Sequence, residues 1–152
     1  MRRVIYSTSN STDLTLYHGS NDPNLTIESI DLNHSAEPGF HVGTREQAMH
    51  VVDTRYSGEG YLYKVVVGSY TVLELEEDLD TDWGNLQSYI RHAINPNADL
   101  LAYNGKRTRP SDIPSIMIGC GYDSASYPNK HEGPGNSLVI FNKAIIKSIQ
   151  LV

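Results

Sequence analysis

Leu16-Tyr17-His18-Gly19-Ser20 is the stretch of this sequence from which the fold is best inferred. Residues 13–18 alternate apolar and polar side chains, which is typical of a strand with one buried face. Gly19 and Ser20 end the predicted strand, and Asn-Asp-Pro at 21–23 is turn chemistry. His18 therefore stands at a strand end, where a polar group can face a cleft, and Gly19 lets a ligand or another backbone approach closely.

A second signal is Gly39-Phe-His-Val-Gly-Thr, followed directly by Arg-Glu-Gln-Ala. It predicts a short strand over 40–43 and a helix that runs toward Arg55. Thr44 can cap that helix, and Gln47 occupies the third position after it, which is the spacing of a capping box. A strand bounded by glycines and followed by a capped helix can form one wall of a pocket.

The remaining chain contains more predicted strands than helices. Strands are expected over 61–67, 70–75, 122–127, 137–141 and 145–151. Helices are expected over 82–94 and 112–118, the latter with Ser111 as cap and Pro114 in its first turn. Residues 25–32 are predicted as a short strand or helix, and 96–110 as a loop. Because strands and helices do not alternate strictly, the pattern indicates an α+β fold in one domain spanning 1–152.

Composition narrows the class of function. Twelve basic against eighteen acidic residues give a net charge of −6, which offers no general attraction for nucleic-acid backbones. The basic strip of Lys106, Arg107 and Arg109 is expected to be a solvated loop. The single cysteine, Cys120, is predicted to be a half-buried structural thiol, and the scattered histidines do not indicate a metal site. The chain shows no apolar leader and no apolar run of about 18 residues, so we expect a soluble cytoplasmic protein.

A third signal is the loop Asn129-Lys-His-Glu-Gly-Pro-Gly-Asn-Ser, directly before the predicted strand 137–141. Glu132 lies in this glycine-rich loop, where a carboxylate can reach a cleft. Taken singly, a loop carboxylate is usually solvated, and a histidine at a strand end is more often structural than functional. The order of the three signals along the chain is what makes them informative.

In that order, the three signals resemble the motifs of the ADP-ribosyltransferases of the diphtheria-toxin and poly(ADP-ribose) polymerase type. Leu-Tyr-His-Gly-Ser looks like their His-Gly motif, and the stretch from Gly39 resembles their second motif, a strand followed by a helix. The strand 136–142, together with Ile-Ile-Lys-Ser-Ile at 145–149, resembles their last motif. With Gly-Tyr-Asp at 121–123, the chain is similar over roughly 14–150 to small bacteriophage members. The resemblance implies a split β-sheet core with short flanking helices.

The resemblance also implies NAD as substrate. His18 would hydrogen-bond a hydroxyl of the nicotinamide ribose, the backbone of Gly19 would hold the nicotinamide amide, and Ser20 would contact the adenine-side ribose. In the family an aromatic side chain from the helix of the second motif stacks on the nicotinamide. The nearest matches here are His50 and, second, Tyr56.

Two positions depart from the family pattern. His41 stands where the strand of the second motif carries tyrosine, and Ser137 stands where the family has its catalytic glutamate. Glu132, five residues earlier, is the expected source of the missing negative charge, with Asp123 as a weaker substitute. Breaking the nicotinamide bond builds cationic oxocarbenium character on the ribose, so a nearby carboxylate would stabilise the transition state.

The function that this resemblance implies is mono-ADP-ribosyl transfer from NAD to a macromolecule, without chain elongation. The expected target is a host protein rather than nucleic acid, reached by a monomer in the host cytoplasm with no membrane involved. Three alternatives stay open: hydrolysis of NAD by water, hydrolysis of another N-glycoside, and a catalytically silent domain of the same fold that binds a protein or nucleotide.

Overall fold

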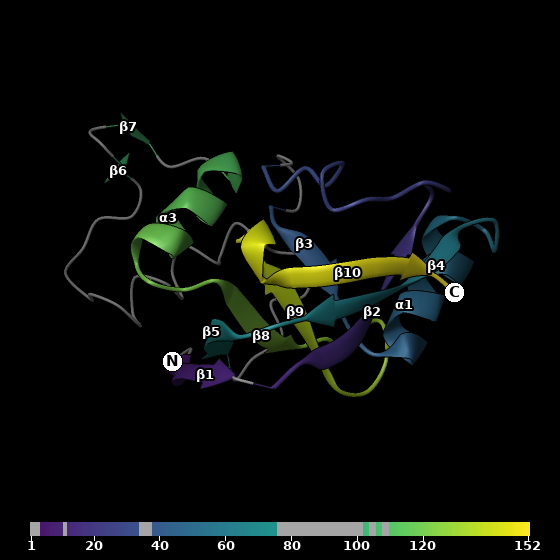
Figure 1. Cartoon of the computed structure of the whole chain (residues 1–152), viewed down its shortest axis with the longest axis horizontal. Coiled ribbons are helices and arrows are strands. Elements are labelled where there is room, and N and C mark those ends of the chain that lie inside the picture. The colour runs from purple at the N-terminus through teal and green to yellow at the C-terminus, as the bar shows by residue number, and fades with distance from the viewer. Residues whose placement is uncertain (1–3, 11, 34–37, 76–101, 104–105, 108–109) are drawn as a thin grey trace.

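The computed structural model describes residues 4–10, 12–33, 38–75, 102–103, 106–107 and 110–152. Within these residues the chain is α+β, as predicted (Figure 1). A five-stranded sheet has the order β1 (Val4–Asn10), β5 (Tyr70–Leu75), β8 (Ser124–Pro128), β9 (Asn136–Ile140) and β3 (Phe40–Val42). A three-stranded sheet has the order β10 (Ile146–Leu151), β4 (Tyr61–Val67) and β2 (Leu14–Ser20). All neighbours are antiparallel except β5 and β8.

Two helices and several short elements complete the described fold. Helix α1 (Arg45–Arg55) packs on β2, and α3 (Ile113–Gly119) follows the 3₁₀ turn Pro110–Asp112. A second 3₁₀ turn, Lys143–Ile145, leads into β10, and a two-stranded ribbon joins β6 (Ala102–Tyr103) to β7 (Lys106–Arg107). No helix in the described ranges is long and apolar enough to cross a bilayer.

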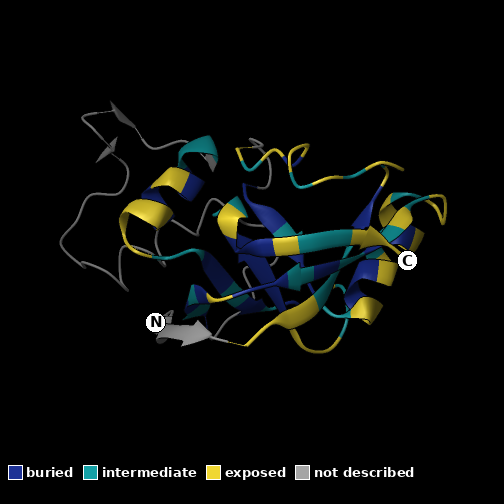
Figure 2. Cartoon of the chain, viewed as in Figure 1, coloured by how far each residue is buried: buried dark blue, intermediate teal, exposed yellow. Residues whose placement is uncertain are grey.

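Strand β9 of the five-stranded sheet is buried on both faces, and its sequence therefore contains the continuous apolar run Leu138-Val139-Ile140. Along β9, Leu138 and Ile140 face a core shared with Val65 and Val67 of the three-stranded sheet. The alternate residue Val139 faces a second core, which α3 covers with side chains that include Met117 and Ile113. Figure 2 shows buried residues throughout the middle of both sheets. This packing places the two sheets face to face and leaves the edge strands β2 and β3 next to each other.

Most predicted elements are confirmed, and several boundaries are wrong. Residues 25–32 form only turns, α3 begins after Asp112 rather than Ser111, and Cys120 is exposed rather than half-buried. The edge strand β1 was not predicted because its Ser- and Asn-rich sequence resembles a loop until it pairs with β5. Strands β6 and β7 interrupt the predicted loop 96–110, and the predicted helix 82–94 lies outside the described residues.

Candidate functional site

In the described residues one backbone bridge joins the edge of β2 to the end of β3, and the two strands separate just beyond it. Tyr17 N–H donates to the Gly43 carbonyl over 2.8 Å, and Gly43 N–H donates back over 2.9 Å. Backbone polar groups of an antiparallel strand point to alternate sides, so Gly19 presents its N–H and C=O on the same side as Tyr17. In the described part of the chain, no backbone hydrogen bond joins Gly19 to β3. These two groups therefore face the gap.

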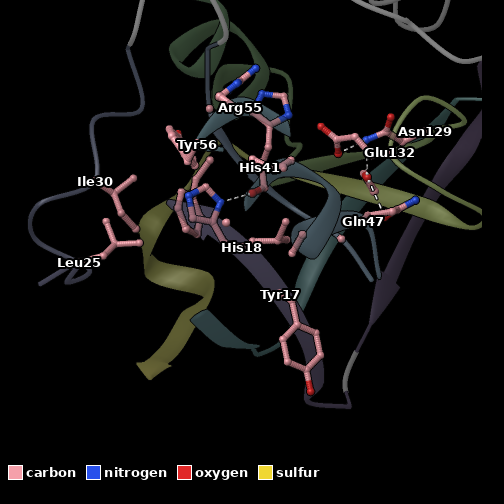
Figure 3. A pocket seen from close by; sticks show the side chains of 18 of the residues that line it. Tyr17, His18, Leu25, Ile30, His41, Gln47, Arg55, Tyr56, Asn129 and Glu132 are labelled. Carbon is pink, nitrogen blue, oxygen red and sulfur yellow. Dashed lines mark hydrogen bonds between the residues drawn. The ribbon is translucent and has the colours of Figure 1, made fainter. Parts of the chain in front are cut away.

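The imidazole of His18 lies across this gap. It bonds a β3 carbonyl that has no backbone partner on β2 in the described residues. Its Nδ1 contacts the carbonyl oxygen of His41 at 2.5 Å, and because a carbonyl only accepts, Nδ1 carries the hydrogen. The ring also packs on Phe40, with the ring centroids 4.3 Å apart. Figure 3 shows the second ring nitrogen on the far side of the ring from this bond. In the neutral ring that nitrogen, Nε2, is an acceptor.

The charge state of His18 follows from its surroundings. Burial lowers the pKa of His18 below its ordinary value, the hydrogen bond to His41 partly opposes this, and the Arg55 guanidinium lowers the pKa further. His18 is therefore neutral at pH 7, with Nε2 available to accept a hydrogen bond. This arrangement suits orientation of a hydroxyl group rather than proton transfer.

A cleft of about 390 Å³ opens at the point where the sheets separate. This volume lies within the range of small-molecule sites, roughly 300–1,000 Å³. Its walls come from β2, β3, α1, the loop after β2 and the loop before β9 (Figure 3). Of the predicted site residues, six line it: His18, Gly19, His41, Tyr56, Glu132 and Ser137.

Gly19 is required by helix packing as well as by the cleft. A Cβ at Gly19 would lie 2.7 Å from the Ala48 carbonyl oxygen and 3.2 Å from side-chain atoms of Val51 and Val52. The close approach expected from this glycine is therefore, at least in part, the approach of α1 to β2. The predicted capping box at the start of α1 is confirmed, because Thr44 and Gln47 bond each other's backbone N–H groups.

The structure does not bring His50 and Ser20 to the cleft. The α1 residues that line the cleft are Gln47, Ala48, Val51 and Arg55, on one face of the helix. His50 lies on another face, because each residue turns the helix by about 100°. It borders a second, more open hollow with Met49 and Asp53, and this hollow shares His131 and Glu132 with the cleft. Ser20 is buried, and its hydroxyl accepts the Asp22 N–H to close the turn after β2.

Tyr56 is thus the expected stacking residue that the structure places in the cleft. It is the residue after the last turn of α1, and the chain reverses there through Ser57 and Gly58, both with positive φ. Gly60 seats the Tyr56 ring, since a Cβ at Gly60 would lie 2.8 Å from a ring carbon. The sequence signal for this placement is the pair of glycines that follows the helix.

Glu132 reaches the same cleft through a buried polar chain. Asn129 Nδ2 donates to Glu132 Oε2 over 2.6 Å and to Ser137 Oγ over 3.0 Å. Ser137 in turn donates to Gln47 Oε1 over 3.0 Å. Asp123 does not offer an alternative carboxylate, because its oxygens accept from the Thr71 backbone and the Asn142 side chain, and it does not line the cleft.

Several cleft residues were missed by the sequence argument. Arg55 follows Val51 by four residues and could have been found from helical periodicity. Tyr127 contacts His41, with its hydroxyl 3.0 Å from Nδ1. Leu25 and Ile30 come from the irregular segment after β2 and carry no periodic signal. Tyr63 holds that segment, because its hydroxyl donates to the Asp22 carbonyl over 2.5 Å and accepts the Leu25 N–H.

The cleft combines hydrogen-bonding groups with two carboxylates, those of Asp31 and Glu132, and with the guanidinium of Arg55. Among the described residues, no three His, Cys, Asp or Glu side chains are grouped so that they could hold a metal ion. The site offers backbone and imidazole groups for binding, a ring for stacking and Glu132 for charge stabilisation. No protein-family model and no curated protein sequence matches the chain at a significant level.

Proposed function

We propose that this chain binds NAD in the cleft between β2 and β3 and transfers ADP-ribose from it to a host protein. One observation carries the proposal: the unbridged N–H and C=O of Gly19 lie beside a neutral His18 at the point where the two sheets separate. A carboxamide such as that of nicotinamide has one acceptor and two donor hydrogens, which complement an N–H and a C=O on one strand edge. A ribose hydroxyl can donate to His18 Nε2.

The architecture supports the same proposal. The ADP-ribosyltransferase core implied by the sequence motifs is a split β-sheet, and the described part of this chain carries a five-stranded and a three-stranded sheet with one backbone bridge between them. The three motifs fall on β2, on β3 with α1, and on β9 with the loop before it. Residues from all three line the cleft.

In the proposed cleavage step, some cleft residues bind the nicotinamide end of NAD and Glu132 stabilises the charge that develops. The bond between ribose C1′ and the nicotinamide nitrogen breaks, and nicotinamide leaves with the electron pair as a neutral molecule. Positive charge develops on the ribose, and the Glu132 carboxylate supplies the opposing charge. A nucleophile of the target then bonds to C1′ and releases its proton to solvent. His18 and Gly19 hold the nicotinamide end, and the Tyr56 ring stacks on it.

The test uses NAD radiolabelled on its adenylate phosphate and a bacterial lysate, with nicotinamide release and label transfer measured together. Release with transfer to a protein is the expected result. The Glu132→Gln variant should lose at least about tenfold in release, because one charged group is removed from the transition state. Glu59→Gln is the matched control, since Glu59 is exposed and does not line the cleft. Equal loss in both variants, or no release by the wild type, would contradict the proposed activity.

A second candidate is a binding protein that holds NAD without cleaving it, and Ser137 favours it. The family places its catalytic glutamate at this position, whereas the Ser137 hydroxyl is buried and already bonded to Gln47 and Asn129. Calorimetric binding of NAD without nicotinamide release would identify this function. Release without label transfer would instead identify a hydrolase that uses water as acceptor.

A further inference from the structure

The loop before β9 is held in place by an unbroken run of hydrogen bonds that ends on Glu132. Gln47, Ser137 and Asn129 have exposed fractions of 1%, 3% and 8%, so the run is shielded from water. Buried polar groups are strongly constrained, because an unmade hydrogen bond there costs about 1–3 kcal/mol. The three side chains come from α1, β9 and the loop itself, and they bind one another only in the folded chain.

The direction of each hydrogen bond is set from the Gln47 end. Gln47 Oε1 accepts the Thr44 N–H over 3.0 Å, and Nε2 donates to the carbonyls of Gly133 and Gly135 over 3.2 and 3.0 Å. The amide orientation of Gln47 is therefore fixed by the backbone. Ser137 has one hydroxyl hydrogen and donates it to Gln47 Oε1, so toward Asn129 it can only accept.

The direction continues to the carboxylate. Asn129 Nδ2 has two hydrogens, and these go to Ser137 Oγ and to Glu132 Oε2. Glu132 Oε2 therefore accepts a hydrogen bond from Asn129, and an ionised carboxylate is the strongest acceptor among the side chains. The same Gln47 side chain bonds the loop on the other side of Glu132, at Gly133 and Gly135. One helical residue therefore fixes both the loop backbone and, through two intermediates, the carboxylate (Figure 3).

We propose that Asn129, Ser137 and Gln47 are positioning residues that aim the Glu132 carboxylate into the NAD cleft. The inference rests on the proposed function and deepens it. In this arrangement Ser137 is a support for a carboxylate displaced five residues upstream. The negative charge that the family carries at the position of Ser137 is thus supplied in this chain by Glu132.

A double-mutant cycle tests whether Asn129 acts through Glu132. Asn129→Ala should lower kcat for nicotinamide release at least about tenfold with little change in KM, since NAD is bound by His18 and Gly19. In the Glu132→Gln background, Asn129→Ala should change kcat less than about twofold, because residues that act as a unit are not additive. Additive effects would overturn the proposal.

Two further variants separate positioning from stability. Asn142→Ala is the matched control, because Asn142 donates to the Asp123 carboxylate over 2.9 Å outside the cleft. It should lower the unfolding midpoint and leave kcat unchanged. The swap Asn129→Asp with Glu132→Gln keeps a hydrogen bond between the two positions, but it leaves no carboxylate at 132 and sets an acceptor at 129 against Ser137 Oγ, whose one hydrogen goes to Gln47. It should therefore recover neither stability nor kcat, and full recovery of kcat would mean that the pair is merely structural.

A readout that needs no catalysis distinguishes this proposal from the proposed function. The side-chain amide resonances of Asn129 in ¹⁵N spectra should shift in Ser137→Ala and in Glu132→Gln, and should not shift in Glu59→Gln. Unmoved resonances would overturn the hydrogen-bond run even in an active enzyme. Shifted resonances in a protein that releases no nicotinamide would contradict the activity and leave the positioning intact.

Discussion

His18 and His41 are joined by a hydrogen bond from a ring nitrogen to a backbone carbonyl, across the gap where β2 and β3 part. The Tyr17–Gly43 bridge sets an antiparallel register in which His41 would next lie opposite Gly19. The His18 ring occupies the His41 carbonyl instead, and Gly19 keeps its backbone groups for the cleft. The His18 side chain thus provides a partner for the His41 carbonyl of β3. It also leaves the N–H and C=O of Gly19 on β2 facing the cleft.

NAD binding should weaken in acid because of His18. Its pKa is lowered in the folded chain, so Nε2 is a lone-pair acceptor at pH 7 and becomes a donor only when the ring is protonated. Calorimetric titrations from pH 8 to pH 5 should show affinity falling below the ordinary histidine pKa of about 6.5. An affinity that rises on acidification would contradict the neutral assignment.

The free energy of unfolding should also fall as the pH is lowered, because of His18. A group whose pKa is lowered by folding binds its proton more readily in the unfolded chain, so stability is full above the unfolded pKa and is lost as pH falls toward the folded one. The urea midpoint should therefore drop between pH 7.5 and pH 5.5, and drop less in His18→Gln. An equal drop in both proteins would assign the dependence to other groups.

Replacing His18 with alanine should remove activity without unfolding the chain. The variant loses the acceptor for the ribose hydroxyl and the bond to His41, so NAD affinity should fall at least about tenfold, or 1.4 kcal/mol. The matched control is His50→Ala, because His50 is exposed on α1 and lies outside the cleft. Calorimetry and nicotinamide release measure both variants. Equal effects would place the binding site elsewhere.

Gly19→Ala should destabilise the fold through α1. The added Cβ would meet the Ala48 carbonyl oxygen at 2.7 Å, and overpacking of this kind costs about 1–3 kcal/mol. Gly119→Ala is the comparison, because a Cβ at Gly119 meets nothing within 4 Å. Its free energy of unfolding should be unchanged or raised by up to about 1 kcal/mol. Urea melts of the two variants decide this, and similar midpoints would contradict the packing argument.

Tyr63→Phe should loosen the segment that covers the cleft. The substitution removes the hydroxyl that bonds the Asp22 carbonyl and the Leu25 N–H, at a cost of about 1–3 kcal/mol. NAD affinity should fall as well, since Leu25 lines the cleft. Tyr61→Phe, on the same strand but exposed, should stay within about 0.5 kcal/mol of the wild type. Unaltered melting of Tyr63→Phe would show that the segment is held by other contacts.

Ser137→Glu should not increase activity, although it restores the residue type that the family carries. Ser137 is 3% exposed, and its hydroxyl lies between Gln47 and Asn129, so a larger charged side chain would break the buried chain. The expected result is a lower melting temperature and no gain in nicotinamide release. Asn136→Glu, one residue earlier and exposed, should melt like the wild type. A gain in release would mean that the carboxylate belongs at 137.

Local sequence patterns determined most of the secondary structure. The capping box of α1 joins residues three apart, and the alternation in β4 and the apolar run in β9 each follow from neighbours in one strand. Such patterns can be read because the physical partners lie a few residues away. Where neighbours carry no pattern, as in β1 and at 25–32, the sequence alone did not identify the structure.

The cleft itself was decided by tertiary structure. Gln47 bonds carbonyls 86 and 88 residues away, and His41 bonds Tyr127 at a separation of 86. The rotation of α1 on β2 determined that Arg55 faces the cleft and that His50 does not. The sequence by itself determined the strand that carries His18 and the glycine-rich loop before β9 that carries Glu132. Sheet register and helix rotation, which depend on contacts distant in the chain, brought the two residues to one cleft.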